Sequence, residues 1–327
     1  MRRRELRGAL LLLDKLHKLI IKNHQKFVKV IDKRYYIKYN ISYMCAAVPK
    51  RGTTRSFVLP EVVLAAEKII VASSKGGVGK TTVALGIAGA LCHIGKKVLL
   101  LDLDFENRCL DLYMGIENAS LFNIADVARG VVPPEKAMIR NSSGLSFVAA
   151  PDNCVVTDDE GERRGISTRS LAEALRATVS VSDADYVIFD TGTSREIPRL
   201  IAATFPGASA IVVASHQAAS TRGAERTAAD LDAAGIRQTR LVICGYEFRA
   251  ASSGKRAGIL DIIDSSKVRL IGAVPYDRAL MLSHENGVRV PAGSPADIAF
   301  RNIAERITGR HVRLFDGIGS LNRKKIL

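Results

Sequence analysis

The nine residues Ser74–Thr82, Ser-Lys-Gly-Gly-Val-Gly-Lys-Thr-Thr, constrain this 327-residue chain more than any other segment. The apolar run Lys68–Ala72 precedes them and is typical of a short buried strand, whereas Val83–Leu91 follows them and is typical of a helix. A glycine-rich loop between a strand and a helix presents successive backbone N–H groups and the helix N-terminus to an anion. The segment therefore predicts a phosphate-binding loop rather than an ordinary Gly-rich turn.

Two residues of this loop carry side-chain chemistry of their own. Lys80 is placed to reach the β and γ phosphates of a nucleoside triphosphate, and the Thr81 hydroxyl is placed to bind Mg²⁺. Ser74 and Lys75 depart from the ordinary motif, in which a glycine opens the loop and no second lysine follows it. We expect the remaining loop residues to enclose the phosphates: Ser74, Lys75, Gly76, Gly77, Val78, Gly79 and Thr82.

Near-continuous apolar runs alternate with helix-like stretches over most of the chain. The runs are Lys68–Ala72, Lys97–Asp102, Leu145–Ala150, Ala184–Asp190, Ala208–Ala214, Thr239–Cys244 and Val268–Val274, and the helix-like stretches include Arg169–Ala177, Ala219–Ala234 and Ala296–Ile307. Strands that are apolar on both faces belong in a sheet covered by helices on both sides. The sequence predicts an α/β fold with a doubly wound, mostly parallel sheet, whose ligands collect at the carboxyl ends of the strands.

Acidic residues stand at the ends of two of these predicted strands. Asp102 ends the second run and Asp104 follows it, while Asp190 ends a later run. At the carboxyl edge of a parallel sheet these side chains should face the phosphate loop. One carboxylate of the Asp102–Asp104 pair can hold a metal-bound water while the other polarises an attacking water, and Asp190 can meet Mg²⁺ through water. An Asp-rich turn that only caps the strand is the alternative.

The loop with its extra lysine resembles the deviant Walker A loop of the MinD/ParA family of P-loop ATPases, and the resemblance extends from about Lys68 to Ile307. Members of that family bind ATP and Mg²⁺ and form face-to-face dimers with ATP between the two copies. The resemblance implies a homodimer in which Lys75 crosses to the partner's nucleotide, much as an arginine finger acts in trans. A solvated loop lysine is the alternative.

The region after the second predicted strand sharpens this resemblance. Asp102, Asp104 and the segment Leu110–Gly115 look like the corresponding region of the septum-site-determining MinD branch of the family. By this resemblance Asp104 activates the attacking water, and Lys75, Lys80 and Asp104 form the catalytic set. The same resemblance implies three residues at the metal: Thr81, Asp102 and Asp190.

Positions near the nucleotide base match the family less well. The turn after Leu270–Val274 resembles the family's base-proximal turn, which makes Pro275 and Asp277 candidate base contacts. Cys244 stands at a base-reading position where the family often has Asn-Arg. After the Asp190 strand the family usually has Ser/Thr-Pro-Ala-Gly, whereas this chain has Thr-Gly-Thr-Ser; Gly192 in place of proline predicts a more flexible switch.

The chain's last residues have an amphipathic pattern. Leu314, Ile318 and Leu321 share one predicted helical face, and three basic residues follow at 323–325. By resemblance to the family, residues 310–327 form a short helix that docks on an anionic membrane. Two such weak tails on one ATP-bound dimer would bind together and gain avidity. A frayed terminus with chance amphipathicity is the alternative.

The first 43 residues differ in composition from the rest and carry most of the chain's net charge of +15, with twelve Lys/Arg against three acidic residues. Lysines at three- and four-residue steps predict a basic amphipathic helix for a membrane or for nucleic acid. Alternatively, residues 1–43 are an upstream region and Met44 is the true start. The expected organisation is therefore an extension over 1–43, a linker over 44–66, an ATPase domain over 67–309 and a tail over 310–327.

Composition excludes several other classes of protein. The five cysteines are scattered without a C-x-x-C pair, which disfavours zinc or iron–sulfur binding and favours a reducing compartment. No apolar run approaches the roughly 18 residues of a membrane-spanning helix.

The function expected from these features is that of a MinD-like Mg²⁺-ATPase that helps to position the division septum. It would hydrolyse ATP slowly until a partner stimulates it, and would also bind a septum inhibitor. It would be cytoplasmic when monomeric and peripheral on the inner face of the cell membrane as an ATP dimer. The alternatives are a ParA-like DNA or plasmid segregation ATPase, which binds nucleic acid, and a nucleotide-binding regulator of flagellum or pilus placement.

Overall fold

The computed structural model describes residues 31–32, 35–36, 66–152, 154–157 and 165–318. The chain divides into two compact units, Met1–Leu64 and Ala65–Leu327. In the first unit, β1 (Ile31–Asp32) pairs antiparallel with β2 (Tyr35–Tyr36), so the helix predicted from the lysine spacing, whose last lysine is Lys33, does not include Ile31–Asp32. The helix was predicted from the spacing of the lysines alone, whereas isoleucine and tyrosine favour extended backbone. The other residues of the predicted extension, and all but Ala66 of the predicted linker, lie outside the described residues.

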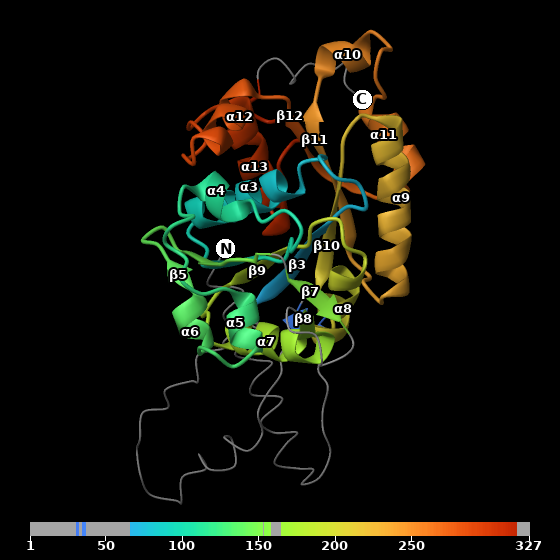
Figure 1. The fold of residues 1–327 in the computed structure, drawn as a ribbon. Coiled ribbons are helices and arrows are strands. Elements are labelled where there is room, and N and C mark those ends of the chain that lie inside the picture. Colours follow the sequence, from blue (N-terminus) through green and yellow to red (C-terminus); the bar gives the residue numbers. More distant parts are fainter. Residues whose placement is uncertain (1–30, 33–34, 37–65, 153, 158–164, 319–327) are drawn as a thin grey trace, which may run out of the picture. The chain divides into compact units, whose positions relative to one another are not determined.

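The second unit is built on an eight-stranded sheet with the order β12-β11-β10-β3-β9-β4-β6-β5 (Figure 1). The strands are β3 (Glu67–Ala72), β4 (Val98–Asp102), β5 (Ile139–Arg140), β6 (Leu145–Val148), β9 (Tyr186–Asp190), β10 (Ser209–Ala214), β11 (Thr239–Tyr246) and β12 (Leu270–Pro275). All neighbouring pairs are parallel except β5–β6 at one edge. The predicted α/β fold with a mostly parallel sheet is confirmed.

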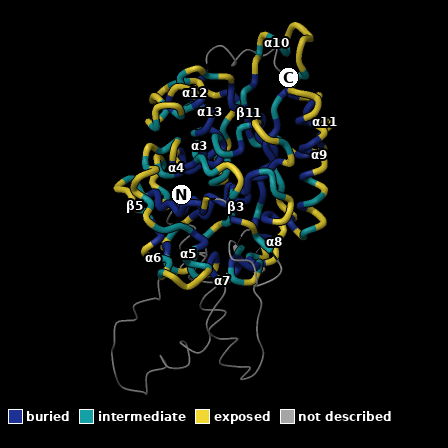
Figure 2. Tube along the Cα trace, in the orientation of Figure 1, coloured by how far each residue is buried: buried dark blue, intermediate teal, exposed yellow. Residues whose placement is uncertain are grey.

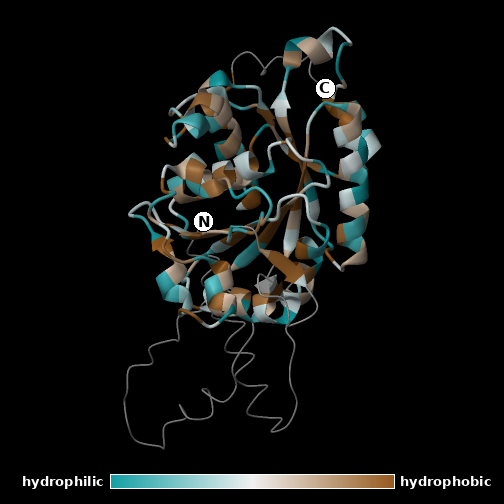
Figure 3. Cartoon of the chain, viewed as in Figure 1, coloured by the Kyte–Doolittle hydropathy of each residue, from teal (hydrophilic) through white to brown (hydrophobic). Residues whose placement is uncertain are grey.

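Burial on both faces explains why these strands are apolar throughout. Every residue of β4 and β9 is buried. In the hydropathy view much of the central sheet is brown, while the outer helices carry most of the teal (Figure 3). Leu99, Leu100 and Leu101 are fully buried, and each such side chain contributes about 1.5–3 kcal/mol to stability relative to exposure. The central strands therefore form the core on which the loops at their ends are fixed.

Helices cover the sheet in two layers, with their outer faces exposed (Figures 1 and 2). One layer holds α3 (Lys80–His93) and α13 (Pro295–Ile307), and the other holds α7 (Thr168–Ser180), α8 (Glu196–Thr204), α9 (Ala218–Ala233) and α11 (Ile259–Ser266). In the first layer the Phe300 ring of α13 lies directly against Gly86 of α3, where a Cβ would clash with it. The position of α3, and so of the loop before it, is thereby fixed against the middle of α13.

Short elements between the main ones escaped the sequence analysis. They are α4 (Leu110–Met114), α5 (Ile124–Ala128), α6 (Pro134–Ala137), α10 (Phe248–Ser252), α12 (Arg278–Glu285) and the parallel pair of β7 (Val155–Thr157) with β8 (Gly165–Ser167). One or two helical turns are too short to show apolar periodicity. Local capping defines them instead, as in α5, where Asn123 and Asp126 form a capping box.

The amphipathic helix predicted for the tail is wrong over residues 310–318, where the structure contains turns and no helix, while docking on a membrane stays a prediction. Phe315 and Ile318 are only 6% and 3% exposed. The Asn302 side chain of α13 donates a hydrogen bond to the Asp316 carbonyl at 2.8 Å, and Gly317 has φ +75° beside Ile298. The core of the second unit therefore uses Ile318, which the sequence analysis placed on the apolar face of the tail. Residues 319–327 lie outside the described residues.

Among the helices of the described ranges, none combines the length and apolar character needed to cross a membrane.

Candidate nucleotide site

The sheet brings the predicted site residues to one edge. β9 lies between β3 and β4, and its Asp190 is in register with Asp102 of β4 and with Val71 of β3. The phosphate loop leaves β3 directly after this point. The two strand-end carboxylates that the sequence singled out are thus neighbours, and both face the same end of the sheet as the loop, as parallel topology requires.

The loop has the backbone of an anion site. Gly77 and Gly79 have φ of +71° and +93°, values that favour glycine. Gly79 is the N-cap of α3 and makes no side-chain cap. The first N–H groups of a helix have no intrahelical partner, so α3 offers them together with its positive N-terminus to a phosphate.

Lys80 is buried at the start of α3, with 6% exposure. Its Nζ donates a hydrogen bond to the Lys75 carbonyl at 3.3 Å. Burial lowers the pKa of Lys80, while the negative charges of Asp190, Asp104 and Glu106 act in the opposite direction. A desolvated ammonium group binds a phosphate strongly, because little water has to be removed from it, and the three carboxylates keep it protonated.

The buried carboxylate of Asp190 lacks partners. Neither of its oxygens makes a hydrogen bond of good geometry, although the Thr81 hydroxyl and the Gly192 N–H lie near enough to lower its pKa. Burial outweighs them and raises the pKa to about 6. Burial, and then the charge of Asp190, also raises the pKa of Asp102 well above its usual range. Such clustered, desolvated carboxylates favour a nearby cation.

These observations fit a Mg²⁺ ion. Asp190 and the Thr81 hydroxyl supply hard oxygen donors beside the phosphate loop. In the described part of the chain, no three His, Cys, Asp or Glu side chains are grouped to hold a metal by themselves. Mg²⁺ commonly takes one or two protein oxygens and completes its shell with water and phosphate oxygens, so this donor set suits a metal that arrives with a nucleotide.

Asp104 is held in a defined position, with 8% exposure. Its Oδ1 accepts hydrogen bonds from the N–H groups of Glu106 at 3.3 Å and Asn107 at 3.0 Å. Gly192, with φ +57°, lies so close that a Cβ built on it would be 2.6 Å from the same oxygen. The sequence explained Gly192 by flexibility; the structure adds a steric reason, since this backbone and this contact both require glycine.

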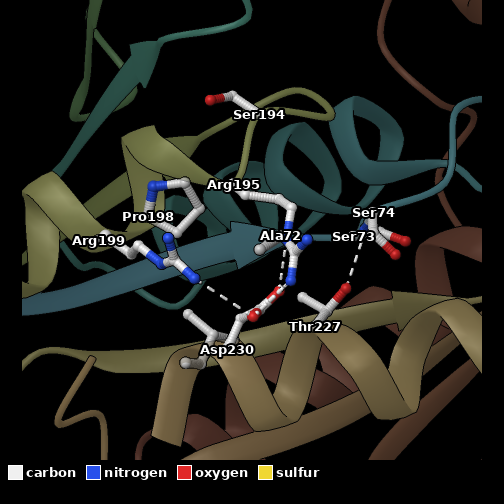
Figure 4. A pocket seen from close by; sticks show the side chains of 10 residues that line it. Ala72, Ser73, Ser74, Ser194, Arg195, Pro198, Arg199, Thr227 and Asp230 are labelled. Atoms are coloured by element: carbon white, nitrogen blue, oxygen red, sulfur yellow. Dashed lines mark hydrogen bonds and ion pairs between the residues drawn. The ribbon is translucent and has the colours of Figure 1, made fainter. Parts of the chain in front are cut away.

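Helix α9 anchors the beginning of the phosphate loop. The Lys75 Nζ donates to the Gln217 Oε1 at 2.6 Å. The Ser74 hydroxyl donates to the Gly223 carbonyl at 3.0 Å. The Ser74 N–H donates to the Thr227 Oγ1 at 2.9 Å (Figure 4). Ser74 thus replaces the ordinary glycine with a residue that ties the loop to α9, and Lys75 lies at the surface between the loop and that helix.

The segment after Asp190 is tied to the same helix. Arg195 donates to both carboxylate oxygens of Asp230, at 2.6 and 2.7 Å, and Arg199 lies 3.4 Å from it (Figure 4). The cavity between these residues and Ser74 has about 20 Å³, which is room for about one water molecule. We interpret it as a packing gap rather than as a ligand pocket.

The predicted base contacts have structural roles. Cys244 is buried against the loop, since a Cβ on Gly79 would lie 2.6 Å from its Sγ, and burial raises its pKa to about 12. Asp277 accepts from the N–H groups of Ala279 and Ala296 at 2.9 and 3.1 Å, so its two carboxylate oxygens cap α12 and α13. Pro275 is buried at the end of β12. Cys244 therefore supports the loop by packing, and Asp277 fixes two helix starts.

Two residues at the site were given no individual role in the sequence analysis. The Thr193 Oγ1 donates a hydrogen bond to the Glu106 Oε2 at 3.1 Å, and the charge of Glu106 acts on Lys80. A Cβ placed on Gly76 would lie 3.9 Å from the Thr193 Cγ2. The sequence gives one indication of them, which is that each closely follows a predicted site aspartate. Glu106 follows Asp104 by two residues, and Thr193 follows Asp190 by three.

Comparison with known proteins decides the family. The model of the ParA family, described as "NUBPL iron-transfer P-loop NTPase", matches residues 65–308. The chain belongs to the ParA/MinD family of P-loop NTPases. It is 30% identical over 257 residues to the septum site-determining protein MinD of Synechocystis, covering 78% of this chain and 94% of that protein.

Solved structures of the family agree. MinD in the MinC:MinD cell division complex of Aquifex aeolicus has a TM-score of 0.66 at 27% identity, over 76% of this chain and 98% of that chain. The MinD of Pyrococcus horikoshii, solved with Mg-ADP, has a TM-score of 0.61 at 21% identity, over 79% of this chain and 99% of that chain, and shares the fold. The resemblance inferred from the loop is confirmed, and the relatives support a MinD-like role in placing the division site.

Proposed function

We propose that this chain is a Mg²⁺-dependent ATPase of the MinD type that dimerises on ATP and helps to position the division septum. The observation that carries the proposal is the convergence of the deviant loop with two strand-end carboxylates. Buried Lys80 and the unpartnered Asp190 lie at the same edge of the sheet as Asp104. In this arrangement Lys80 provides a positive charge for the transferred phosphate. Asp190 provides carboxylate oxygens for the metal ion that accompanies the nucleotide.

In the proposed reaction each residue has one task. Lys80 and the N–H groups at the start of α3 bind the β and γ phosphates. Mg²⁺, when bound beside Thr81 and Asp190, supplies charge neutralisation on the phosphate oxygens. Asp104, fixed by the backbone of its own turn, orients the attacking water. The Oδ1 of Asp104 already accepts hydrogen bonds from the backbone of its own turn. We therefore propose that Oδ2 is the oxygen that binds the attacking water.

Dimerisation is assigned to Lys75. In the single chain its ammonium group donates a hydrogen bond to the Gln217 Oε1 in an exposed position, where a stronger acceptor can displace that partner. A triphosphate on a second copy is such an acceptor, because it carries several charges where Gln217 offers an amide dipole. We propose that Lys75 leaves Gln217 for the partner's nucleotide when two ATP-bound copies meet.

Membrane association is assigned to residues 319–327. They hold Leu321, Ile326 and Leu327 with three basic residues at 323–325. One such tail binds an anionic bilayer weakly, and two on a dimer bind together with a gain of roughly 10²–10⁴. The protein would then be cytoplasmic when apart and peripheral on the membrane's inner face as a dimer. Likeness to the MinC:MinD complex supports a septum inhibitor as a partner, and an ATPase activator is expected beside it.

The iron-transfer activity named in the family description has less support here. The described cysteines Cys92, Cys109, Cys154 and Cys244 are all free. Burial raises the pKa of each of these thiols. In the described ranges they contribute to no group of three ligands. Thiolate is the form that binds iron, so none is prepared for it.

The test compares four proteins in assays of nucleotide binding, dimerisation, hydrolysis and liposome sedimentation. Lys80→Ala should abolish ATP binding, Lys75→Ala should bind ATP but fail to dimerise or turn over, and Asp104→Ala should remain an ATP dimer. Sedimentation with anionic liposomes and retention on DNA are measured with ATP and with ADP. A wild-type protein that stays monomeric with a non-hydrolysable ATP analogue and Mg²⁺ contradicts the proposal, and ATP-dependent retention on DNA without lipid binding favours the ParA-like alternative.

A further inference from the structure

The Thr193–Glu106 hydrogen bond joins the two loops that carry the proposed chemistry. Glu106 belongs to the turn after β4, which contains Asp104, and Thr193 belongs to the segment after β9, which follows Asp190. Their side chains meet at 3.1 Å. This is a contact between residues 87 positions apart in sequence, made at the mouth of the site rather than inside the sheet.

Each side of this contact is linked to Asp104. The backbone N–H of Glu106 donates to the Asp104 Oδ1 at 3.3 Å. Gly192, directly before Thr193, packs its Cα against the same carboxylate. Asp104 is therefore held between the backbone of its own turn and the backbone of the facing loop, and the Thr193–Glu106 bond closes these two loops around it.

We propose that Thr193 and Glu106 form a bracket that positions Asp104, a role that rests on the proposed ATPase function. In this proposal neither residue contacts the attacking water, and both act through Asp104. The bracket also compensates for the glycine at position 192, which otherwise gives the facing loop more freedom.

Substitutions distinguish the positioning role of the Thr193–Glu106 hydrogen bond from an effect of the Glu106 charge on the site. Thr193→Val removes the hydroxyl and keeps the shape, while Glu106→Ala removes the acceptor. Thr193→Ser and Glu106→Gln retain a donor and an acceptor. We expect the first two variants each to lower kcat about two- to tenfold, the size expected for one lost hydrogen bond, with little change in KM. The double variant should lose no more than either single one, because both remove the same bond. The two conservative variants should restore most of the activity.

Hydrogen exchange gives a readout that needs no turnover. The amides of Glu106 and Asn107 donate to Asp104, so their exchange rates report whether that carboxylate stays in place. In nucleotide-free protein, Thr193→Val should speed the exchange of both amides, although the substitution lies in the facing loop and leaves Glu106 and Asn107 unchanged. Glu173→Ala, which breaks an exposed ion pair with Arg169 on α7, is the matched control and should leave them unchanged.

The outcomes are distinct. Additive losses in the double variant overturn the bracket, as does unchanged exchange of the 106 and 107 amides in Thr193→Val. If Glu106→Gln loses as much as Glu106→Ala while Thr193→Val is active, Glu106 acts through its charge on Lys80 and the bracket is wrong. If the wild type hydrolyses no ATP, the proposed function fails, and exchange alone decides the bracket.

Discussion

Replacing Gly192 with alanine should separate hydrolysis from nucleotide binding. The residue has φ +57° and faces the carboxylate of Asp104 rather than the phosphate loop. An added methyl group therefore strikes the residue we assign to the attacking water and leaves Lys80 and the start of α3 in place. The expected phenotype is a protein that binds ATP and turns it over slowly.

The structure sets the size of the effect. The new Cβ would lie 2.6 Å from the Asp104 Oδ1 and Cγ, whereas ordinary non-bonded contacts are about 3.5 Å. Asp104 or the facing loop must therefore move by about 0.9 Å. A misplacement of about 1 Å costs roughly 10²-fold in rate at a catalytic group, so we expect kcat to fall by about 10- to 100-fold. The left-handed backbone adds about 1–2 kcal/mol of destabilisation.

A matched control accounts for the destabilisation that alanine causes in a left-handed backbone. Gly130 has φ +70°, and a Cβ there meets no atom within 4 Å, so Gly130→Ala carries similar backbone strain without the contact. Single-turnover phosphate release, fluorescent nucleotide binding and thermal unfolding are measured for both variants. Equal kcat values in the two variants, or loss of ATP binding in Gly192→Ala alone, would show that the Asp104 contact does not have the role we assign.

The remaining predictions concern other parts of the site and the chain end. Burial raises the Asp190 pKa to about 6 from 3.8, so its stabilising contribution to the nucleotide-free protein is complete below about pH 4 and is lost as the pH rises through 6. Asp190→Asn should reduce the fall in thermal stability between pH 4 and pH 7 and should abolish Mg²⁺-dependent ATP binding; an unchanged pH profile would show that another group titrates. Cys244, with a pKa of about 12, should resist alkylation by iodoacetamide at pH 8 in the native protein and react in urea, as mass spectrometry can determine; rapid native labelling would contradict its packing under Gly79. Deleting 319–327 should leave the melting temperature within a few degrees and release the protein from anionic liposomes, whereas deleting 314–327 should also destabilise it, because Phe315 and Ile318 are buried; equal melting temperatures of the two truncations would refute the core role of 314–318.

The phosphate loop, the strands around it and the fold class can all be predicted from the amino-acid sequence. Local rules suffice for these, because a Gly-rich turn, a helix start and a strand that is apolar on both faces are each encoded within a few neighbouring residues. The sequence also placed Asp102 and Asp190 together, since parallel topology brings strand ends to one edge.

Tertiary structure alone decided the contacts between segments far apart in the chain. Thr193 with Glu106, Gly192 with Asp104, and Cys244 under Gly79 involve pairs that no periodicity marks. The described end of the chain is a similar case. An amphipathic pattern indicates that one face is buried, but it does not indicate what covers that face, and Ile318 is covered by the protein's own core. Which apolar or polar group becomes a neighbour depends on the packing of whole helices and strands, and this is a property of the folded chain rather than of any window of its sequence.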